Sequence, residues 1–336
     1  MASIALYGFG RIGRQFLRVG LLEGLFEPVA IADIGDEATL AALFAVDTNY
    51  GRWHEPVAGS TGQLTIGERK IPYLNSAKEV PDWAALGAAV VVDCSGRATT
   101  RAGAQVHLDR GAKCVLVSTA SKTLADCDAV LLKGINLDSF DPAAHHIVSM
   151  GSCTTNALAV AIKVILENFG IQYGLFSTLH SYTNTQSLTD QPMKDRRDSW
   201  AAAENIIPSS SGAARALQFI WPGLQITGKA YRIPTRTGSI AELNLVTEKE
   251  CTVQEVNDAF RAAAQEGVVN FLHGVIDVLE DEWASSRIVG DPHSCLIDLP
   301  LTAKEGNLLS VAAWYDNEWG FSNRLAEVAA YLAARL

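Results

Sequence analysis

The stretch SIALYGFGRIGRQFLRVGLL, residues 3–22, decides the fold of this 336-residue chain. It opens with a short apolar run from Ser3 to Tyr7, and the glycines Gly8, Gly10 and Gly13 follow at once. Glycine permits a tight turn and lets the backbone approach a pyrophosphate, while the first N–H groups of the following helix attract an anion. The stretch predicts a strand, turn and helix that bind a dinucleotide. The glycines by themselves would also fit an ordinary tight turn.

Asp33 stands at the end of the second expected strand, 20 residues beyond Gly13. A carboxylate at this point accepts both hydroxyls of the adenosine ribose and repels a 2′-phosphate. The spacing therefore favours NAD over NADP. Taken alone, an aspartate at a strand end is also typical of a cap on the next helix or turn.

Short β-branched runs alternate with amphipathic stretches through the first half of the chain, a rhythm typical of a parallel sheet covered by helices. We expect one helix from Thr99 to Arg110, closed by Gly111. The expected strands are Ser3 to Tyr7, Val29 to Ala32, Val90 to Asp93, Val115 to Ser118 and His146 to Ser149. Residues 1–150 are thus predicted to form an α/β, Rossmann-type, doubly wound NAD-binding domain.

The pattern changes near residue 150. A helix is expected from Thr154 to Asn168, and the longer extended runs Tyr173 to Leu179 and Ile240 to Val246 follow it. Residues 151–317 are predicted to form a second, α+β catalytic domain with a mixed or antiparallel sheet. The alanine- and leucine-rich end, from Asn323 to Leu336, predicts a helix. We expect the segment from about 318 to 336 to pack back on the first domain.

Composition excludes several classes of function. The chain is 48% hydrophobic with a formal net charge of −10, which favours a soluble globular protein and argues against a nucleic-acid partner. No secretory signal and no apolar run of about 20 residues is visible, so we expect a cytoplasmic protein without a membrane anchor. The six cysteines lack metal-ligand spacing, which predicts reduced thiols and no metal site.

Cys153 lies in Gly151-Ser152-Cys153-Thr154-Thr155-Asn156, directly before the helix expected in the second domain. A helix N-terminus favours the thiolate, which attacks an aldehyde carbon to give a hemithioacetal. Loss of hydride to a nicotinamide then leaves a thioester. The alternative is a small buried cysteine that serves only packing.

His180 ends the extended run from Tyr173 to Leu179 and begins a polar segment. An imidazole that emerges at a sheet edge could take a proton from a thiol or a hemithioacetal. Sequence alone does not show that it meets Cys153, and a lone histidine is more often a surface or structural residue.

Five sequence blocks resemble the glyceraldehyde-3-phosphate dehydrogenase family, in its order and near its spacing along essentially the entire chain. The blocks are GFGRIGR at 8–14, GSCTTN at 151–156, HSYTNTQ at 180–186, NIIPSSSGAA at 205–214 and WYDNEWGFSNR at 314–324. The GSCTTN and WYDNE blocks are much more specific than the glycine motif. The resemblance implies an NAD-dependent aldehyde dehydrogenase of the phosphorylating, acyl-transfer type, with Cys153 as nucleophile and His180 as base.

The resemblance also implies the binding residues. Arg11 and Ile12 would offer backbone groups to the cofactor phosphates beside Gly8, Gly10 and Gly13, Asp33 would hold the ribose, Ser95 and Ser118 would line the cofactor cleft, and Asn317 would bind the nicotinamide carboxamide. Pro192 matches the NAD-using members. Two anion pockets would be built from Ser152, Thr154, Thr183, Ser211, Gly212 and Arg232. The family is typically tetrameric, with residues 181–205 at a subunit interface.

The chain departs from the family at three positions. Most members carry an arginine where Trp200 stands, and that arginine helps to hold the phosphate that attacks the thioester. Its loss would weaken a phosphate site by roughly 1 to 3 kcal/mol unless another group compensates. Arg196 or Arg197 could reach the same pocket, although Asp195 and Asp198 could pair with both. Met150 and Ala157 replace the usual asparagine and second cysteine.

We therefore expect oxidation of glyceraldehyde 3-phosphate to an acyl phosphate, with NAD as hydride acceptor and inorganic phosphate as acyl acceptor. The first alternative is a related dehydrogenase for another anionic aldehyde, such as erythrose 4-phosphate, with a different acceptor. The second is an NAD-binding regulatory module that has lost turnover.

Overall fold

A computed structural model describes residues 3–265 and 272–336. These residues form two compact units. Unit 1 contains the described residues up to Leu132, together with Asn136–Gly151 and Ser322–Leu336. Unit 2 contains Lys133–Ile135 and the described residues of Ser152–Phe321.

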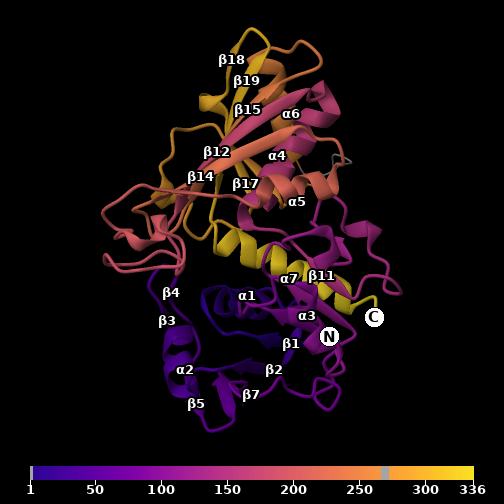
Figure 1. Cartoon of the computed structure of the whole chain (residues 1–336), viewed down its shortest axis with the longest axis vertical. Coiled ribbons are helices and arrows are strands. Elements are labelled where there is room, and N and C mark those ends of the chain that lie inside the picture. Colours follow the sequence, from indigo (N-terminus) through magenta and orange to yellow (C-terminus); the bar gives the residue numbers. More distant parts are fainter. Residues whose placement is uncertain (1–2, 266–271) are drawn as a thin grey trace. The chain divides into compact units, whose positions relative to one another are not determined.

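A nine-stranded sheet forms the centre of unit 1 (Figure 1). Its order is β10-β11-β9-β8-β1-β2-β7-β6-β5, parallel from β10 to β7 and antiparallel beyond it. The strands are β1 Ser3–Tyr7, β2 Glu27–Asp33, β5 Val57–Ser60, β6 Gln63–Ile66, β7 Arg69–Asn75, β8 Val90–Asp93, β9 Cys114–Val117, β10 Ala129–Val130 and β11 Ile147–Ser149. The predicted doubly wound parallel sheet is confirmed. The antiparallel strands β5 and β6 were not anticipated.

Strand β1 lies between β2 and β8, so the order of the sheet reverses at β1. Ligands of doubly wound folds bind at the carboxyl ends of the strands where this reversal occurs. The glycine turn after β1 and the loop after β8 both lie at that point.

Three helices of unit 1 were predicted, and α2 was not. The helix expected from Thr99 to Arg110 begins at Arg101, because the Thr100 side chain caps it, and ends at Leu108. The helices are α1 Arg11–Leu22, α2 Glu37–Ala45, α3 Arg101–Leu108 and most of α7 Trp319–Ala333, with the 3₁₀ turns η1 Leu124–Asp126 and η2 Leu137–Ser139. A small two-stranded sheet joins β3 Val46–Asp47 to β4 Gly51–Arg52.

Unit 2 has a mixed eight-stranded sheet, as the sequence predicts. Its order is β13-β14-β12-β15-β19-β17-β16, with β18 paired to β19, and only the pairs β12/β14 and β16/β17 are parallel. The strands are β12 Tyr173–Ser181, β13 Ile207–Ser209, β14 Ile226–Ile233, β15 Ser239–Val246, β16 Ile276–Leu279, β17 Cys295–Asp298, β18 Ala303–Glu305 and β19 Leu308–Tyr315.

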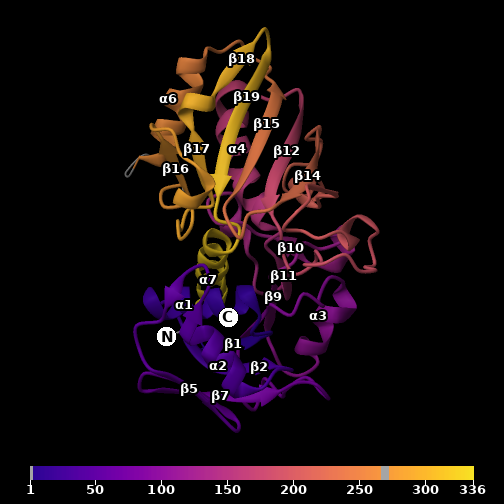
Figure 2. The same ribbon diagram turned by 90° about the vertical axis from the view of Figure 1, so that its left-hand side faces the viewer.

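Helices pack on one face of this sheet. Helix α4 contacts β15, β17 and β19, α5 contacts β14, and α6 contacts β16; Figure 2 shows α4 behind β12, β15 and β19. The helices are α4 Cys153–Phe169, α5 Ala213–Ile220 and α6 Val253–Ala264, with the 3₁₀ turns η3 Arg197–Ser199, η4 Ser285–Arg287 and η5 Leu299–Leu301. Strand β12 alternates as a half-covered strand should, with Phe176, Thr178 and His180 buried and Leu175 and Leu179 exposed.

No helix among the described residues is both long and apolar enough to cross a membrane. Within the same part of the chain, no three His, Cys, Asp or Glu side chains are grouped to hold a metal ion.

Candidate active site

Cys153 is the first residue of α4, and its position is fixed by the cap that precedes it. The Ser152 hydroxyl accepts the N–H of Thr155 at 3.0 Å, and the Thr155 hydroxyl accepts the N–H of Ser152 at 3.1 Å. This reciprocal pair stabilises the start of a helix. The capped turn therefore holds the half-buried thiol at the start of the helix, beside the N–H groups of its first turn.

His180 is brought to this thiol by strand β12. Its Nε2 lies 3.3 Å from Cys153 Sγ, within hydrogen-bonding reach for sulfur, and its side chain is buried. The structure thus joins the two residues whose contact the sequence left open. A nucleophile beside a base is the arrangement that covalent catalysis requires.

Arg232 of β14 approaches the other side of the His180 ring, because it stands opposite His180 in the parallel pairing of β12 and β14. Its guanidinium lies 2.6 Å from His180 Nδ1, and the carbonyl of Ser181 lies 2.7 Å from the same nitrogen. The carbonyl only accepts and needs a proton on Nδ1, whereas the guanidinium only donates and needs a lone pair there; it also donates to the carbonyl at 3.2 Å. The two contacts thus favour opposite tautomers. The tautomer with the proton on Nδ1 is the one that presents the lone pair of Nε2 to the thiol.

Burial sets the charge state of the pair. It lowers the pKa of His180 to about 3, helped by the positive charge of Arg232 and opposed by the Ser181 carbonyl. Burial also raises the pKa of the Cys153 thiol, although Arg232 and the N–H and hydroxyl of Thr154 act in the opposite direction. The resting pair is a neutral imidazole and a thiol. The helix N-terminus favours the thiolate as predicted, but the loss of water outweighs it.

The pKa of His180 predicts a pH-dependent stability. The unfolded chain binds a proton at His180 below about pH 6.5, whereas the folded chain binds it only near pH 3. The free energy of unfolding should therefore fall as the pH drops from 6.5 towards 3, by up to about 1.4 kcal/mol per pH unit from this group. Urea titrations should show a shallower pH dependence for His180→Asn than for the unaltered protein. Equal slopes would contradict the assigned burial of the imidazole.

Tyr315 and Thr178 complete the surroundings of the thiol, and the sequence reasoning missed both. The Tyr315 hydroxyl lies 2.7 Å from Thr178 Oγ1 and 3.0 Å from Thr154 Oγ1, and its ring meets the His180 ring edge to face. Burial raises the pKa of this phenol, so it remains neutral. Thr178 could have been found from the sequence, because it precedes His180 by two residues in a strand and such residues share one face of the sheet. Tyr315 stood within the WYDNE block.

The predicted substrate positions all lie in unit 2, and the structure joins some of them directly. Arg232 contacts His180, and its buried Nε has no partner among the described residues, so it offers a donor to an anion. Thr154 bonds to Tyr315, while Thr183 bonds to Gln186 and Thr185. Gly212 is the N-cap of α5, and the Ser211 hydroxyl accepts the N–H of Ala213 at 3.3 Å. No contact joins Ser211 or Gly212 to Cys153 among the described residues.

The glycine turn of unit 1 has the shape of a phosphate-binding turn. A Cβ at Gly13 would lie 2.1 Å from the Gly8 carbonyl, and one at Gly8, where φ is +94°, would lie 2.5 Å from Ser95 N. These two glycines are needed for close packing. A Cβ at Gly10 would meet nothing within 4 Å, so that residue borders open space at the start of α1. An anionic ligand fits there, beside the N–H groups of the first turn of α1.

Asp33 ties the end of β2 to this turn. One carboxylate oxygen accepts the N–H of Phe9 at 2.5 Å, and the other accepts the N–H of Gly35 at 2.8 Å. The half-buried carboxylate retains lone pairs for further donors. These bonds hold the Asp33 carboxylate in place. It does not cap α2, because the side chain of Asp36 forms that cap.

Asn317 of unit 2 is held by its amide oxygen. This oxygen accepts the N–H of Gly238 at 3.2 Å and the hydroxyls of Ser239 at 2.9 Å and Thr237 at 3.4 Å. The backbone N–H fixes which end of the amide is the oxygen. The amino group is thereby turned to the other side and presented as a donor.

Trp200 follows the turn η3 and is 54% exposed. It borders a cavity of about 390 Å³ together with Arg197, Asn205, Ile206, Ile207 and Pro208. Asp195 accepts the backbone N–H of Arg197, and Asp198 accepts the side chain of Gln186. Among the described contacts, neither carboxylate pairs with the guanidinium of Arg196 or Arg197. The pairing that the sequence left open is therefore absent from the described contacts, and Arg197 lies beside the indole.

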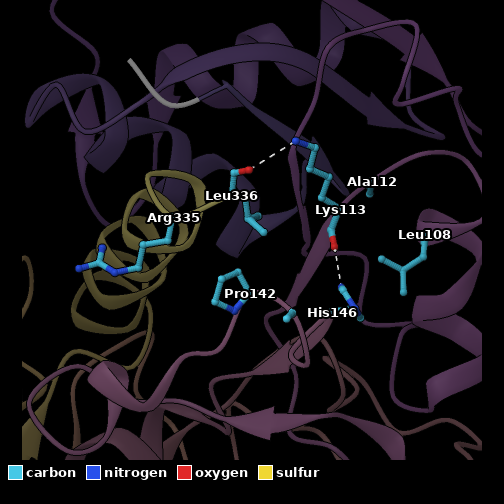
Figure 3. Close-up of a pocket in the computed structure, with 8 residues that line it drawn as sticks. Leu108, Ala112, Lys113, Pro142, His146, Arg335 and Leu336 are labelled. Carbon is cyan, nitrogen blue, oxygen red and sulfur yellow. Dashed lines mark hydrogen bonds between the residues drawn. The ribbon is translucent and has the colours of Figure 1, made fainter.

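A larger cavity, of about 690 Å³, lies in unit 1 away from every candidate residue. Figure 3 shows Lys113 directed towards the carboxyl end at Leu336 and the Arg335 guanidinium turned away from the other lining side chains. The Arg335 guanidinium stacks on Tyr331. The cavity is lined by Leu108, Ala112, Lys113, Pro142, Ala143, His146, Arg335 and Leu336. It contains no nucleophile and base in contact.

Comparison with known proteins identifies related chains. The model of the glyceraldehyde 3-phosphate dehydrogenase NAD binding domain matches residues 2–101, and that of the C-terminal domain matches residues 152–317. The glyceraldehyde-3-phosphate dehydrogenase of Streptomyces coelicolor is 42% identical over 99% of each chain. The protein of the same name from Kitasatospora aureofaciens is 44% identical over 100% of each chain. The one from Geobacillus stearothermophilus is 40% identical, over 99% of this chain and 98% of that relative. These matches confirm the resemblance.

Proposed function

Because the chain belongs to the glyceraldehyde-3-phosphate dehydrogenase family, we propose that it oxidises glyceraldehyde 3-phosphate through a thioester on Cys153. NAD-dependent oxidation of this aldehyde is the activity that the family models and the full-length relatives support. The observation that carries the residue assignment is the 3.3 Å contact between Cys153 Sγ and His180 Nε2.

The first step is attack of sulfur on the aldehyde carbon. His180 Nε2 takes the thiol proton as the carbon–sulfur bond forms, and the carbonyl π bond breaks to leave an alkoxide on the hemithioacetal. The imidazolium formed at His180 lies beside that oxygen and can return or share the proton. The N–H groups at the start of α4 offer partial positive charge to the same developing anion.

The second step converts the hemithioacetal to a thioester. Bound NAD supplies the acceptor for the hydride that leaves the hemithioacetal carbon. His180 holds the hydroxyl proton as the carbon–oxygen double bond re-forms, and releases it to solvent. Inorganic phosphate then attacks the thioester, the carbon–sulfur bond breaks, and Cys153 is regenerated as the acyl phosphate departs.

The remaining candidates take binding roles in this proposal. Arg232, with its unpartnered Nε, and Thr183 hold the phosphate of the aldehyde, while Ser152, Thr154, Ser211 and Gly212 receive the attacking phosphate. Backbone groups of the glycine turn hold the NAD pyrophosphate, and Asp33 holds the ribose. Ser95 and Ser118 line the cofactor site, and the amino group of Asn317 donates to the nicotinamide carboxamide.

The deciding experiment measures NADH formation with a panel of aldehydes, each with and without inorganic phosphate and with NADP in place of NAD. We expect turnover with glyceraldehyde 3-phosphate and NAD that requires phosphate. An unchanged steady rate without phosphate would contradict the proposal that phosphate is the acyl acceptor. A preference for erythrose 4-phosphate would contradict the proposed substrate. Absence of turnover with every aldehyde would favour the regulatory module.

Replacing Trp200 with arginine should strengthen phosphate binding. The substitution restores a bidentate cation, which contributes roughly 1 to 3 kcal/mol to such a site, so the KM for phosphate should fall about 5- to 150-fold. The KM for the aldehyde should stay unchanged, and Trp200→Phe serves as the control that keeps an aromatic ring. If Trp200→Arg leaves the phosphate KM at its original value, then Arg197 or another group already fills this role.

We further propose a homotetramer in the cytoplasm. Among the described residues, no helix covers one face of the unit 2 sheet, and this face exposes Tyr173, Leu175, Leu179 and Leu308. Leu188, Trp200 and Ile206 add exposed apolar side chains on the segment between β12 and β13. Apolar area of this kind is typical of subunit interfaces. Sedimentation velocity should show one species of four chains, and a monomer would contradict this assignment.

A further inference from the structure

Three buried side chains hold Ser95 in one hydrogen-bonded chain at the carboxyl end of β8. The indole N–H of Trp83 donates to Nδ1 of His107 at 3.1 Å, and His107 Nε2 lies 3.1 Å from Asp93 Oδ2. The other oxygen of Asp93 accepts the N–H of Ser95 at 2.8 Å and its hydroxyl at 2.7 Å. Trp83, His107 and Asp93 are each at most 2% exposed, so water does not compete for these bonds.

The partners of His107 determine which ring nitrogen carries the proton. An indole N–H only donates, so Nδ1 must present a lone pair to Trp83. A carboxylate only accepts, so the proton lies on Nε2 and is donated to Asp93. The direction of every bond in the chain is thereby fixed, and the carboxylate is held in one orientation.

Asp93 also connects Ser118 and the glycine turn to this chain. Its backbone carbonyl accepts the N–H of Ser118 at 3.0 Å. Ser95 packs so closely on the turn that a Cβ at Gly8 would lie 2.5 Å from its nitrogen. The orientation of the Asp93 carboxylate therefore sets the position of Ser95 against the turn that follows β1, whereas Ser118 is joined to the Asp93 backbone.

We propose that His107 and Asp93 are positioning residues for the cofactor, which hold Ser95 in the arrangement that receives NAD. The proposal rests on the cofactor role proposed above for Ser95. Burying a carboxylate and an imidazole costs free energy that apolar side chains of the same volume would avoid. We infer that His107 and Asp93 are present because the loop after β8, which contains Ser95, must be held in one position, and not for stability alone. Trp83 supports them by fixing the tautomer.

The first test is Asp93→Asn, which preserves shape but turns one acceptor into a donor. While its oxygen accepts from Ser95, its amino group meets the Nε2 proton of His107, so two donors face each other. Calorimetric titration without substrate should show NAD bound about tenfold more weakly, the scale of one disrupted buried hydrogen bond. Unchanged affinity would overturn the proposal.

The second test is recovery by Trp83→Phe in the Asp93→Asn background. Without the indole donor, the proton of His107 can move to Nδ1, and Nε2 can then accept from the asparagine amide. We expect NAD affinity to recover by about threefold, the scale of a partly restored hydrogen bond. Nitrogen NMR of His107 should show the protonated nitrogen change. A double variant that binds NAD less tightly than Asp93→Asn, with no tautomer change, contradicts the fixed chain.

Asp128→Asn is the control, because Asp128 is likewise an aspartate held by hydrogen bonds in unit 1, from the N–H groups of His146 and Ile147 and from the Arg101 guanidinium. Its NAD affinity should stay within about twofold of the unaltered protein, as for a distant substitution. If Asp93→Asn and Asp128→Asn lost equal NAD affinity at an equal loss of Tm, Asp93 would have only a structural role and the proposal would be wrong. Failure of the unaltered protein to bind NAD would overturn the cofactor site itself, a separate outcome.

A second pair of variants keeps the test decisive where Asp93→Asn does not fold. His107→Gln retains a side-chain amide that can donate to Asp93, whereas His107→Leu removes the donor. His107→Gln should therefore bind NAD more tightly than His107→Leu. Equal NAD affinities for the two variants would contradict a role for the bond from His107 to Asp93.

Discussion

Cys153→Ser should abolish the thioester and lower kcat by on the order of 10⁴-fold or more, the scale seen when an enzyme loses its nucleophile. Serine preserves the size of the side chain and a hydrogen bond to His180 Nε2. Its hydroxyl is far harder to ionise than a thiol, and a base whose pKa is lowered to about 3 cannot compensate. Stopped-flow measurement of NADH and mass spectrometry of the acylated chain should both show the loss.

The control for this substitution is Cys251→Ser. Cys251 is 6% exposed, and its sulfur has a polar neighbour, Thr247 Oγ1, at 4.0 Å. This variant should retain kcat and should still acylate. NAD binding should be the same in both variants, because the glycine turn and Asp33 are unchanged. If Cys153→Ser turned over at a rate within tenfold of Cys251→Ser, another group would be the nucleophile.

Local sequence signals predicted the features that depend on neighbouring residues. The glycines after Tyr7 predicted β1 and α1, because close packing of Gly13 on the Gly8 carbonyl is a property of that one turn. The helix predicted from Thr154 begins one residue earlier, at Cys153, where Ser152 and Thr155 form a reciprocal cap. Such local signals were enough to predict the family membership, the doubly wound sheet and the mixed second sheet.

Contacts between distant segments could not be predicted in this way. Arg232 reaches His180 because β14 pairs in parallel with β12 in one particular register, and no local pattern specifies that register. Tyr315 reaches Thr154 across 161 residues of sequence. The raised pKa of Cys153 has the same origin, since the elements that bury the thiol come from separate parts of the chain. The resemblance to the family identified the candidate residues, but only the three-dimensional structure shows how their neighbours shift their pKa values.

The directions of both pKa shifts disfavour an ion pair between Cys153 and His180 in the resting site. The charge of Arg232 lies closest to the imidazole and lowers its pKa, while burial raises the pKa of the thiol. Proton transfer from sulfur to His180 therefore belongs to the reaction and not to the free protein. The lone pair of Nε2 remains available over the entire neutral and mildly acidic range.

His180→Asn should lower kcat by about 10²- to 10⁴-fold, the usual contribution of a general base. Asparagine fills the space near the Ser181 carbonyl but offers no basic nitrogen to Cys153 Sγ. Alkylation of Cys153 by neutral iodoacetamide should also slow at pH 7 and recover as rising pH ionises the thiol directly. In the unaltered protein this alkylation should lose little rate between pH 7 and 5.5, because the imidazole has a pKa of about 3 and stays unprotonated.

His293→Asn is the matched control for the base, because His293 is a half-buried histidine of unit 2 that pairs with Asp291 at 2.9 Å and does not contact the thiol. It should leave kcat and the alkylation profile unchanged. A His180→Asn variant with kcat within threefold of His293→Asn would assign the proton to another acceptor. The neighbouring Tyr315 cannot take that role while its phenol stays neutral, since burial raises its pKa. The thiol would then have to ionise unaided, and the rate would rise steeply with pH.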